Sequence, residues 1–289
     1  MTERLADISA RIGGIQQLGA VVSAMRGIAA ARVQQAGGQL AAVDRYAAVI
    51  ASAIARALVL APAARPGLMY KPGIARKPAR PALVLFCAEQ GFAGAFSGRV
   101  LDSVGGDLGT VELFLVGTRG RAALAERGIT ARWTGAMPSH SPGVPKLADR
   151  IAQALYKGIA QGRIDQLDAV FSQWQGGQGI RVERRRLFPF DMTAFPAAKA
   201  AAAPLLYLAP AALLQDLTAD YLHAQLCEAA LHAFAAENEA RMEAMAAARS
   251  QIERQLASLQ AKQRQVRQEE ITAEIIELAA GETASRSAG

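Results

Sequence analysis

Residues 237–281 read ENEARMEAMAAARSQIERQLASLQAKQRQVRQEEITAEIIELAAG. This stretch has no proline and no internal glycine, and it is rich in Ala, Glu, Gln, Arg and Leu, which favour helices strongly. One set of its positions alternates spacings of four and three residues, which is typical of a coiled-coil seam. That set comprises Met245, Arg249, Ile252, Leu256, Leu259, Gln263 and Val266. The stretch therefore predicts a long helix that requires a second helix as its partner.

The N-terminal 60 residues supply a candidate for that partner. Residues 2–60 predict one long helix with an apolar stripe at helical spacing. The stripe comprises Ile8, Ile12, Ile15, Val22, Met25, Ile28, Val33 and Leu40. Six glycines interrupt it, at positions 13, 14, 19, 27, 37 and 38. Each costs up to ~1 kcal/mol relative to alanine, so we expect them where another helix packs closely. An antiparallel pair of the two terminal helices is favoured over two unrelated helices on separate partners.

Between these helices the pattern changes twice. Residues 61–81 carry five prolines and several basic residues, which predict a solvated linker without regular structure. Residues 82–189 then alternate short apolar runs with amphipathic segments, which predicts a mostly parallel sheet covered by helices. Strands are expected at ALVLFCA, VELFLVG, ITARWTG and LDAVFSQWQ, with IRVERRRLFP as a hairpin partner of the last. Helices are expected near 97–104, at TRGRAALAERG and, with Pro145 at its start, at VPKLADRIAQALYKGIAQG.

The predicted fold class is thus α/β plus coiled coil: a long antiparallel two-helix coiled coil from the chain termini with an inserted α/β domain. Its parts are the first helix (1–60), the α/β domain (80–190) and the last helix (205–289). MTAFPAAKAAAAP, before the last helix, predicts a loop, and Pro210 is placed like a first-turn proline.

Composition limits the class of protein. The 289 residues are 52% hydrophobic but only 6% aromatic, which suits packed helices. With 32 basic and 25 acidic residues the net charge is +7, which fits either an acidic partner or a solvated basic surface. Cys87 and Cys227 form no disulfide or metal pattern. No signal peptide and no apolar run long enough for a membrane span is recognisable, so a soluble protein is expected.

The motifs for catalysis are weak. No lysine follows a glycine, which excludes a Walker A loop. The turn at residues 90–94 could present backbone amides to an anion, but a plain strand-to-helix turn is favoured. His223 and His232 lie nine residues apart and do not share the helix face of a zinc site. We therefore predict no catalytic, cofactor-binding or metal-binding residues.

Two polar residues occupy the predicted seam. Burying Arg249 or Gln263 without a partner would cost about 1–3 kcal/mol, so each either fixes the register or marks a place where the coil is open. The seam fades at residues 267–272, where the helix either frays or continues without its partner.

Three motifs, in order, resemble the gamma subunit of rotary ATP synthases over nearly the whole length. Residues 24–32, AMRGIAAAR, are similar to the family pattern Ala-Met-x-x-Val-Ala-Ala-x-Lys. Residues 88–95, AEQGFAGA, are similar to the family's Ser-Asp-Arg-Gly-Leu-Cys-Gly-Gly. The last helix matches without gaps at Arg241, Met242, Ala244, Met245, Arg267, Gln268, Ile271, Thr272, Glu274, Glu277 and Gly281.

The resemblance implies a non-catalytic central-stalk rotor subunit that couples transmembrane ion flow to ATP synthesis or hydrolysis in the beta subunits. It implies, as partners, the alpha and beta subunits, the epsilon subunit and the membrane c-ring, with membrane contact only through the complex. The implied location is peripheral, on the cytoplasmic face of the bacterial inner membrane. It also implies beta-subunit contacts at Arg267, Gln268 and Thr272, and a place near the neck of the shaft for Met25, which we group with them.

The chain departs from the family at several positions. Residues 20–23 lack two of the usual lysines and a threonine, Ala93 replaces a cysteine, and Arg249 and Gln251 replace Thr and Asn. These departures favour a divergent paralogue from a second, specialised rotary ATPase. Two other classes stay open on the residues alone. One is an α/β-domain enzyme or nucleotide-binding protein oligomerised by a coiled coil, and the other is a basic coiled-coil nucleic-acid binder.

Overall fold

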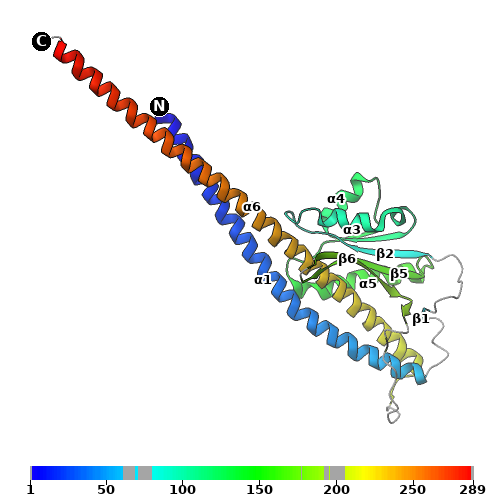
Figure 1. The fold of residues 1–289 in the computed structure, drawn as a ribbon. Coiled ribbons are helices and arrows are strands. Elements are labelled where there is room, and N and C mark those ends of the chain that lie inside the picture. The colour runs from blue at the N-terminus through cyan, green and yellow to red at the C-terminus, as the bar shows by residue number, and fades with distance from the viewer. Residues whose placement is uncertain are drawn as a thin grey trace. The chain divides into compact units, whose positions relative to one another are not determined.

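The computed structural model contains two long helices, one in the N-terminal and one in the C-terminal part of the sequence (Figure 1). The structure describes residues 2–60, 69–70, 80–176, 178–191, 195 and 206–287. Helix α1 spans Thr2–Leu60 and helix α6 spans Pro210–Ser287. The bounds of α1 agree with the first helix predicted from periodicity. Helix α6 begins at Pro210, which was predicted to be a first-turn proline. The expected loop at residues 192–204 lies outside the described residues except for Phe195.

The chain divides into two compact units. The first comprises Met1–Ile28 and Met242–Gly289, and the second comprises Ala29–Arg241. Each long helix therefore contributes one end to the first unit and the remainder to the second.

The first unit is an antiparallel pair of helices. Val22 of α1 packs against Met245 and Ile252 of α6 in a small buried cluster. The two polar seam positions also reach α1: Arg249 Nη1 donates to Ser23 Oγ at 3.0 Å, and Gln263 Nε2 donates to Ser9 Oγ at 2.9 Å. Because both hydrogen bonds join the helices, these residues fix the register, which was one of the two alternatives.

The seam is less uniform than the heptad pattern predicts. Met245, Ile252 and Val266 are buried, Leu256, Leu259 and Gln263 are half-buried, and Arg249 is exposed. The prediction of a buried seam position is therefore wrong for Arg249, whose long side chain reaches Ser23 from the edge of the interface. Ile28 is also 55% exposed, so it does not belong to the apolar stripe that contacts α6.

The expected role of the α1 glycines is largely wrong. A Cβ atom added at Gly19 would lie 3.5 Å from Ile252, as expected for a closely packed position. A Cβ atom added at the other five would meet nothing within 4 Å. Those five positions face open space, so close packing by α6 does not explain them.

The second unit contains a five-stranded sheet in the order β4-β3-β2-β5-β6. Strands β2, β3, β4 and β5 are parallel, and β6 is antiparallel to β5. Their bounds are Pro81–Phe86 (β2), Glu112–Val116 (β3), Trp133–Gly135 (β4), Gln166–Gln175 (β5) and Gly179–Phe188 (β6). The mostly parallel sheet and the β5–β6 hairpin confirm the predicted fold class.

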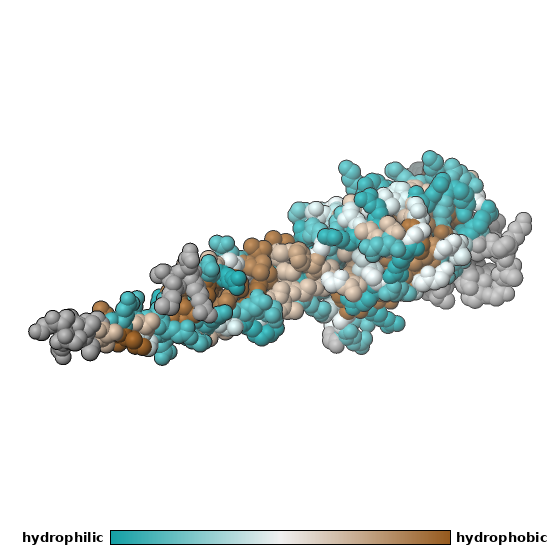
Figure 2. All heavy atoms as spheres, turned by 90° about the horizontal axis from the view of Figure 1, so that it is seen from above, coloured by the Kyte–Doolittle hydropathy of each residue, from teal (hydrophilic) through white to brown (hydrophobic). Residues whose placement is uncertain are grey.

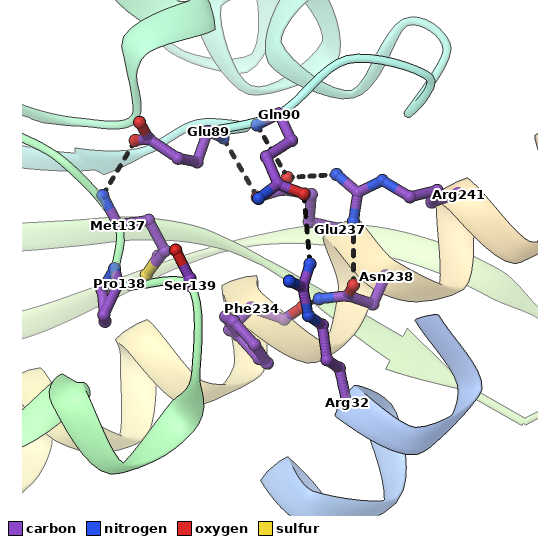
Figure 3. Close-up of a pocket in the computed structure, with 10 residues that line it drawn as sticks. All are labelled: Arg32, Glu89, Gln90, Met137, Pro138, Ser139, Phe234, Glu237, Asn238 and Arg241. Carbon is purple, nitrogen blue, oxygen red and sulfur yellow. Dashed lines mark hydrogen bonds and ion pairs between the residues drawn. The ribbon is translucent and has the colours of Figure 1, made fainter. Parts of the chain in front are cut away.

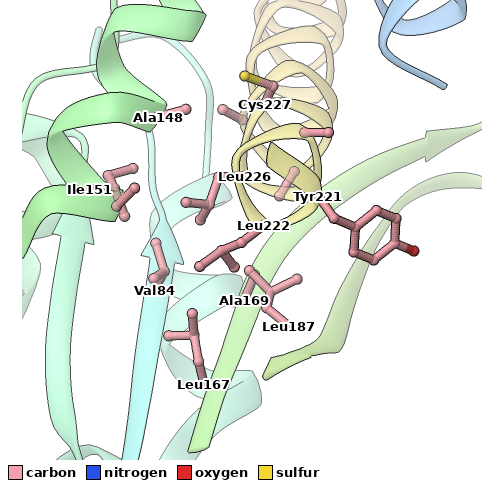
Figure 4. Close-up of a cluster of buried hydrophobic side chains, with 14 of the residues drawn as sticks. Val84, Ala148, Ile151, Leu167, Ala169, Leu187, Tyr221, Leu222, Leu226 and Cys227 are labelled. Atoms are coloured by element: carbon pink, nitrogen blue, oxygen red, sulfur yellow. The ribbon is translucent and has the colours of Figure 1, made fainter. Parts of the chain in front are cut away.

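Helices cover both faces of this sheet, because the parallel strands are apolar on both sides. Helices α3 (Phe96–Val104) and α4 (Thr118–Glu126) pack on the face that presents Leu83 and Leu85. Helix α5 (Val144–Ala160) and α6 pack on the opposite face (Figure 4), and buried residues of α1 such as Ile54 belong to the same hydrophobic cluster. Two short 3-10 helices, η2 (Gly105–Gly109) and η3 (Ser141–Gly143), complete the connections.

One segment of the predicted linker is regular. Met69–Tyr70 forms strand β1, which pairs in parallel with β7, Phe190–Asp191. The proline pattern excluded regular structure here, and that prediction is wrong for these two residues because they lie between prolines and keep their own backbone donors. Pro81 likewise begins β2 instead of preceding it. The rest of the linker lies outside the described residues.

Candidate functional site

A partly buried polar cluster of the second unit lies at the carboxyl end of β2. There the chain turns through residues 87–95 into α3. We name the Glu237 cluster after its central residue; it comprises Arg32, Gln90, Glu237, Asn238 and Arg241 (Figure 3). Its members come from α1, the β2–α3 loop and α6, so three segments remote in sequence meet at one point.

The carboxylate of Glu237 receives three donors. The backbone N–H groups of Glu89 and Gln90 donate to its two oxygens, each at 3.1 Å. The Arg241 guanidinium, one helical turn along α6, donates to Oε1 at 2.5 Å. Two successive backbone amides and a guanidinium are the kind of donor set that binds anions in proteins.

The remaining donors of Arg241 are also used. Its Nη1 donates to Asn238 Oδ1 at 2.8 Å, and its Nε donates to the carbonyl oxygen of Gly91 at 3.2 Å. Glu237, Asn238 and Arg241 are 3%, 1% and 4% exposed. A buried ion pair is tolerable only when its remaining hydrogen-bonding groups are satisfied, and the additional bonds supply this.

A second carboxylate, that of Glu89, binds the loop to other segments of the second unit. Glu89 Oε2 accepts hydrogen bonds from the backbone N–H groups of Thr118, at 3.2 Å, and Met137, at 2.9 Å. The Thr118 hydroxyl donates to the Glu89 carbonyl at 2.9 Å. The loop is therefore tied to α4 and to the segment after β4 as well as to α6.

Helix α1 joins the cluster through one contact. Arg32 Nη1 donates to the side-chain oxygen of Gln90 at 3.1 Å. The pocket that these side chains line has a cavity volume of only about 10 Å³. Typical small-molecule pockets measure roughly 300–1,000 Å³, so this one is too small for a nucleotide.

The turn that was considered as an anion site is therefore occupied from within the chain. The backbone amides of residues 89 and 90 are bound to Glu237, and the following residues make the turn itself: Phe92 has φ 62° and Gly94 has φ 57°. Phe92 is 66% exposed. The preferred interpretation as a strand-to-helix turn fits this geometry, although the prediction did not identify the carboxylate that holds it.

A cysteine, a histidine and an aspartate also come together, outside this cluster. Cys227 Sγ lies 3.8 Å from His223 Nδ1, and His223 Nε2 lies 3.0 Å from Asp149 Oδ1. Burial raises the pKa of the Cys227 thiol to about 12, and burial raises the pKa of Cys87 to about 12 as well. Nucleophilic cysteines need a lowered pKa, so both buried thiols act as core side chains.

The residues assigned by resemblance lie in the first unit. Met25 is half-buried against Val22 and Met245. Arg267, Gln268 and Thr272 are exposed on α6, and the Thr272 hydroxyl donates to the Gln268 carbonyl at 2.8 Å. None of them belongs to the Glu237 cluster.

Periodicity alone did not single out Glu237. The available signal was its spacing: Glu237 and Arg241 lie four residues apart within an alanine-rich segment that the structure buries against the α/β domain. A Glu–Arg pair at i, i+4 on the buried face of a helix indicates an internal ion pair.

Two negative findings apply to the described part of the chain. No group of three or more His, Cys, Asp or Glu side chains there is arranged to hold a metal ion. No helix there is both long enough and apolar enough to cross a membrane.

Comparisons with known proteins agree with this fold. The chain is 27% identical to the ATP synthase gamma chain of Hyphomonas neptunium, over 96% of this chain and 98% of that relative. It is 26% identical to the ATP synthase gamma chain of Anaeromyxobacter dehalogenans, with the same shares covered.

Solved structures show the same architecture at lower identity. A chain of the Euglena gracilis mitochondrial ATP synthase, OSCP/F1/c-ring, superposes with a TM-score of 0.61 at 13% identity, covering 99% of this chain and 96% of that chain. A chain of the Tetrahymena thermophila mitochondrial ATP synthase central stalk/c-ring superposes with a TM-score of 0.54 at 15% identity, covering 79% and 99%.

A family model described as ATP synthase matches residues 4–284, which is almost the whole chain. Together with relatives named gamma chain over their full length, this match makes the chain a member of the ATP synthase gamma-chain family.

Proposed function

We propose that this chain is the central-stalk subunit of a rotary ATP synthase, whose rotation couples transmembrane ion flow to ATP synthesis or hydrolysis in neighbouring subunits. Two of the structural neighbours support this role: one is the central stalk/c-ring of the Tetrahymena thermophila mitochondrial ATP synthase, and the other is the rotor of the Euglena gracilis enzyme. In this proposal the chain carries no catalytic residue, and nucleotide chemistry takes place in the beta subunits.

The observation that carries the proposal is the free end of α6. Ser9 lies opposite Gln263, and α1 begins seven residues earlier at Thr2. At this register the N-terminal end of α1 lies opposite about residue 270 of its antiparallel partner α6. Helix α6 nevertheless continues to Ser287.

This free end exposes large apolar side chains among polar ones, seen as brown patches beside teal atoms (Figure 2). Ile271, Ile275, Ile276 and Leu278 are exposed by 51%, 61%, 64% and 75%. A solvated helix end with four exposed large apolar side chains within eight positions is unfavourable in water. We infer that other subunits cover it in the assembled enzyme.

The same reasoning applies to the proposed contact residues. Arg267 and Gln268 lie just before this free end and Thr272 lies within it, and all three are exposed. We propose that they contact the beta subunits, and that Met25, on α1, lies near that interface. Contacts that differ between orientations of the stalk would favour different conformations of each beta subunit, which is coupling by differential binding.

The further partners in this proposal are the alpha subunits, the epsilon subunit and the membrane c-ring. The chain would lie peripherally on the cytoplasmic face of a bacterial inner membrane and contact it only through the complex. We propose the division into helix 1–60, α/β domain 80–190 and helix 205–289, with the middle part facing epsilon and the c-ring. The departures at residues 20–23 support assignment to a specialised second rotary ATPase.

Co-purification with alpha and beta subunits from the same source tests the proposal directly. We expect a stable complex that hydrolyses ATP. Arg267→Ala should lower coupled turnover several-fold, because it removes a proposed beta contact. Arg264→Ala, an exposed arginine one turn earlier on the same helix, is the matched control and should leave turnover unchanged.

Two results would contradict the proposal. Failure of the wild-type chain to join alpha and beta would exclude the stalk assignment. Full coupled activity of the Arg267→Ala complex would remove that residue from the interface while leaving the assignment intact.

A further inference from the structure

The donors around Glu237 have the composition of an anion-binding site. Two adjacent backbone amides, at residues 89 and 90, and the guanidinium of Arg241 converge on one carboxylate. A loop that follows a parallel strand and leads into a helix commonly presents its amides to a bound anion. Here the anion is a side chain of the same protein.

The position in the sheet supports this reading. From β2 the chain moves to β3 and β4 on one side, whereas β5 lies on the other side of β2. In open α/β sheets, ligands bind beyond the carboxyl ends of the strands where the strand order reverses. Residues 87–95 follow β2 at that point, and α6 brings Glu237 into it (Figure 3).

We propose that Glu237 is an internal anionic ligand, bound in a carboxylate cradle formed by the loop at the end of β2 and by Arg241. Occupation of the cradle fixes the loop on α6, and the Arg32–Gln90 hydrogen bond fixes it on α1. The exposed Phe92, whose φ is positive, owes its position to this arrangement. Glu237 is thus a positioning residue for the loop.

The arrangement joins one loop of the α/β domain to both long helices of the second unit. A shift of α6 by one residue would rotate Glu237 by about 100° and empty the cradle. If the chain works as the proposed central stalk, which this consequence assumes, the cluster keeps the α/β domain and the helices moving together.

The test is chemical rescue of the full chain carrying Glu237→Ala. The variant leaves a cradle without its carboxylate, so formate or acetate should raise its Tm by several degrees more than chloride at equal ionic strength. Wild type and Glu243→Ala, an exposed glutamate on the same helix, should show no such difference. The double variant Glu237→Ala/Arg241→Met should lose the rescue, because it lacks the guanidinium.

Amide hydrogen exchange gives a local readout. In Glu237→Ala the amides of Glu89 and Gln90 should exchange about tenfold faster or more, since each loses a charge-assisted hydrogen bond. Formate should slow them again. Should Glu237→Ala fail to fold, Glu237→Gln, which keeps one acceptor, should show faster exchange at these two amides only.

Equal stabilisation of wild type and Glu237→Ala by formate would overturn the proposal, as would unchanged exchange at residues 89 and 90. These measurements use the isolated chain, so they do not depend on the stalk assignment. In the assembled complex, coupled activity of Glu237→Ala should fall and recover with formate. If the Glu237→Ala complex assembles and stays fully coupled, the cradle itself is not contradicted, but its mechanical role is excluded.

Discussion

At position 241, a buried guanidinium neutralises a buried carboxylate, and the two side chains are only 5% and 4% exposed. Arg241→Met leaves Glu237 charged and desolvated, with two backbone amides as its remaining donors. Removing one partner of a buried pair costs about 3–5 kcal/mol. We therefore expect urea unfolding of Arg241→Met to show a loss of stability of at least about 3 kcal/mol.

A double variant separates the loss of the pair from the penalty of an unpaired charge. Glu237→Leu/Arg241→Met replaces both charges by apolar side chains of similar length, and it should be more stable than Arg241→Met alone. Arg264→Met, at an exposed position of α6, should unfold like wild type. A double variant less stable than Arg241→Met would show that packing, not the unpaired charge, dominates.

A second carboxylate, Glu228, makes stability depend on pH. Burial raises its pKa, but hydrogen bonds with His232 and Arg185 outweigh burial, so the net pKa is lowered from 4.5. A lowered folded-state pKa contributes stability above the unfolded value, and this is lost as pH falls through the folded value. We expect stability to decrease on acidification below about pH 4.5, and Glu228→Gln to reduce that decrease.

Asp44 acts in the opposite direction and must be separated from Glu228. Burial and then the charge of Glu228 raise the pKa of Asp44, so its contribution to stability falls as pH rises through that pKa. Urea midpoints between pH 3 and 6 for wild type, Glu228→Gln and Asp44→Asn distinguish the two. If the urea midpoint of Glu228→Gln falls as steeply with decreasing pH as that of wild type, the assignment to Glu228 is contradicted.

At the scale of elements, sequence patterns predict most of what local interactions determine. The strands at β2, β3 and β5 and the helices α4 and α5 follow from apolar runs, turn residues and helical periodicity. Strand β4 is shorter than the predicted ITARWTG run, and β1 was missed altogether. Both depend on pairing with residues distant in sequence, which a local pattern does not contain.

The candidate site illustrates the same limit. The sequence indicated that the turn at residues 90–94 could present backbone amides to an anion, but it favoured a plain strand-to-helix turn. Its occupant, Glu237, comes from about 150 residues further along the chain. The glycines of α1 show the converse error: their cost in a helix predicted close packing at six positions, but only Gly19 has a neighbour from α6 within 4 Å.

Gly19 supplies a test of the helix register. A Cβ atom there would lie 3.5 Å from the Ile252 side chain, so cysteines at these two positions come within disulfide reach. We expect Gly19→Cys/Ile252→Cys to form the bond on mild oxidation of the full chain, seen as a mobility change on a non-reducing gel. Gly19→Cys/Leu259→Cys, one heptad further along α6, should stay reduced; efficient bonding of that pair would indicate a shifted register.

At the scale of the whole molecule, a buried charge in one unit and an exposed apolar surface in the other have different causes. The second unit pairs the buried carboxylate of Glu237 with Arg241, whereas the first exposes four large apolar side chains near the end of α6. A folding requirement explains the first arrangement, since buried charges must be paired. It does not explain the second, because no described residue of α1 lies opposite the apolar residues after position 270.

Truncation after Glu270 separates the two requirements. The shortened chain keeps every α1–α6 contact described above, so its Tm should stay within about 1–2 °C of the full chain, because only residues outside the paired region are removed. Its retention in a complex with alpha and beta subunits should fall, because the four exposed apolar side chains of 271–278 are lost. The measurement is the fraction of chain that co-elutes with alpha and beta, together with the circular dichroism of the isolated chain.

Ile275→Ser/Leu278→Ser in the full-length chain keeps the helix but removes apolar surface, and it should weaken retention in the same direction. A large drop in Tm on truncation would show that the end of α6 stabilises the chain itself, and unchanged retention of both variants would mean that no partner covers this end.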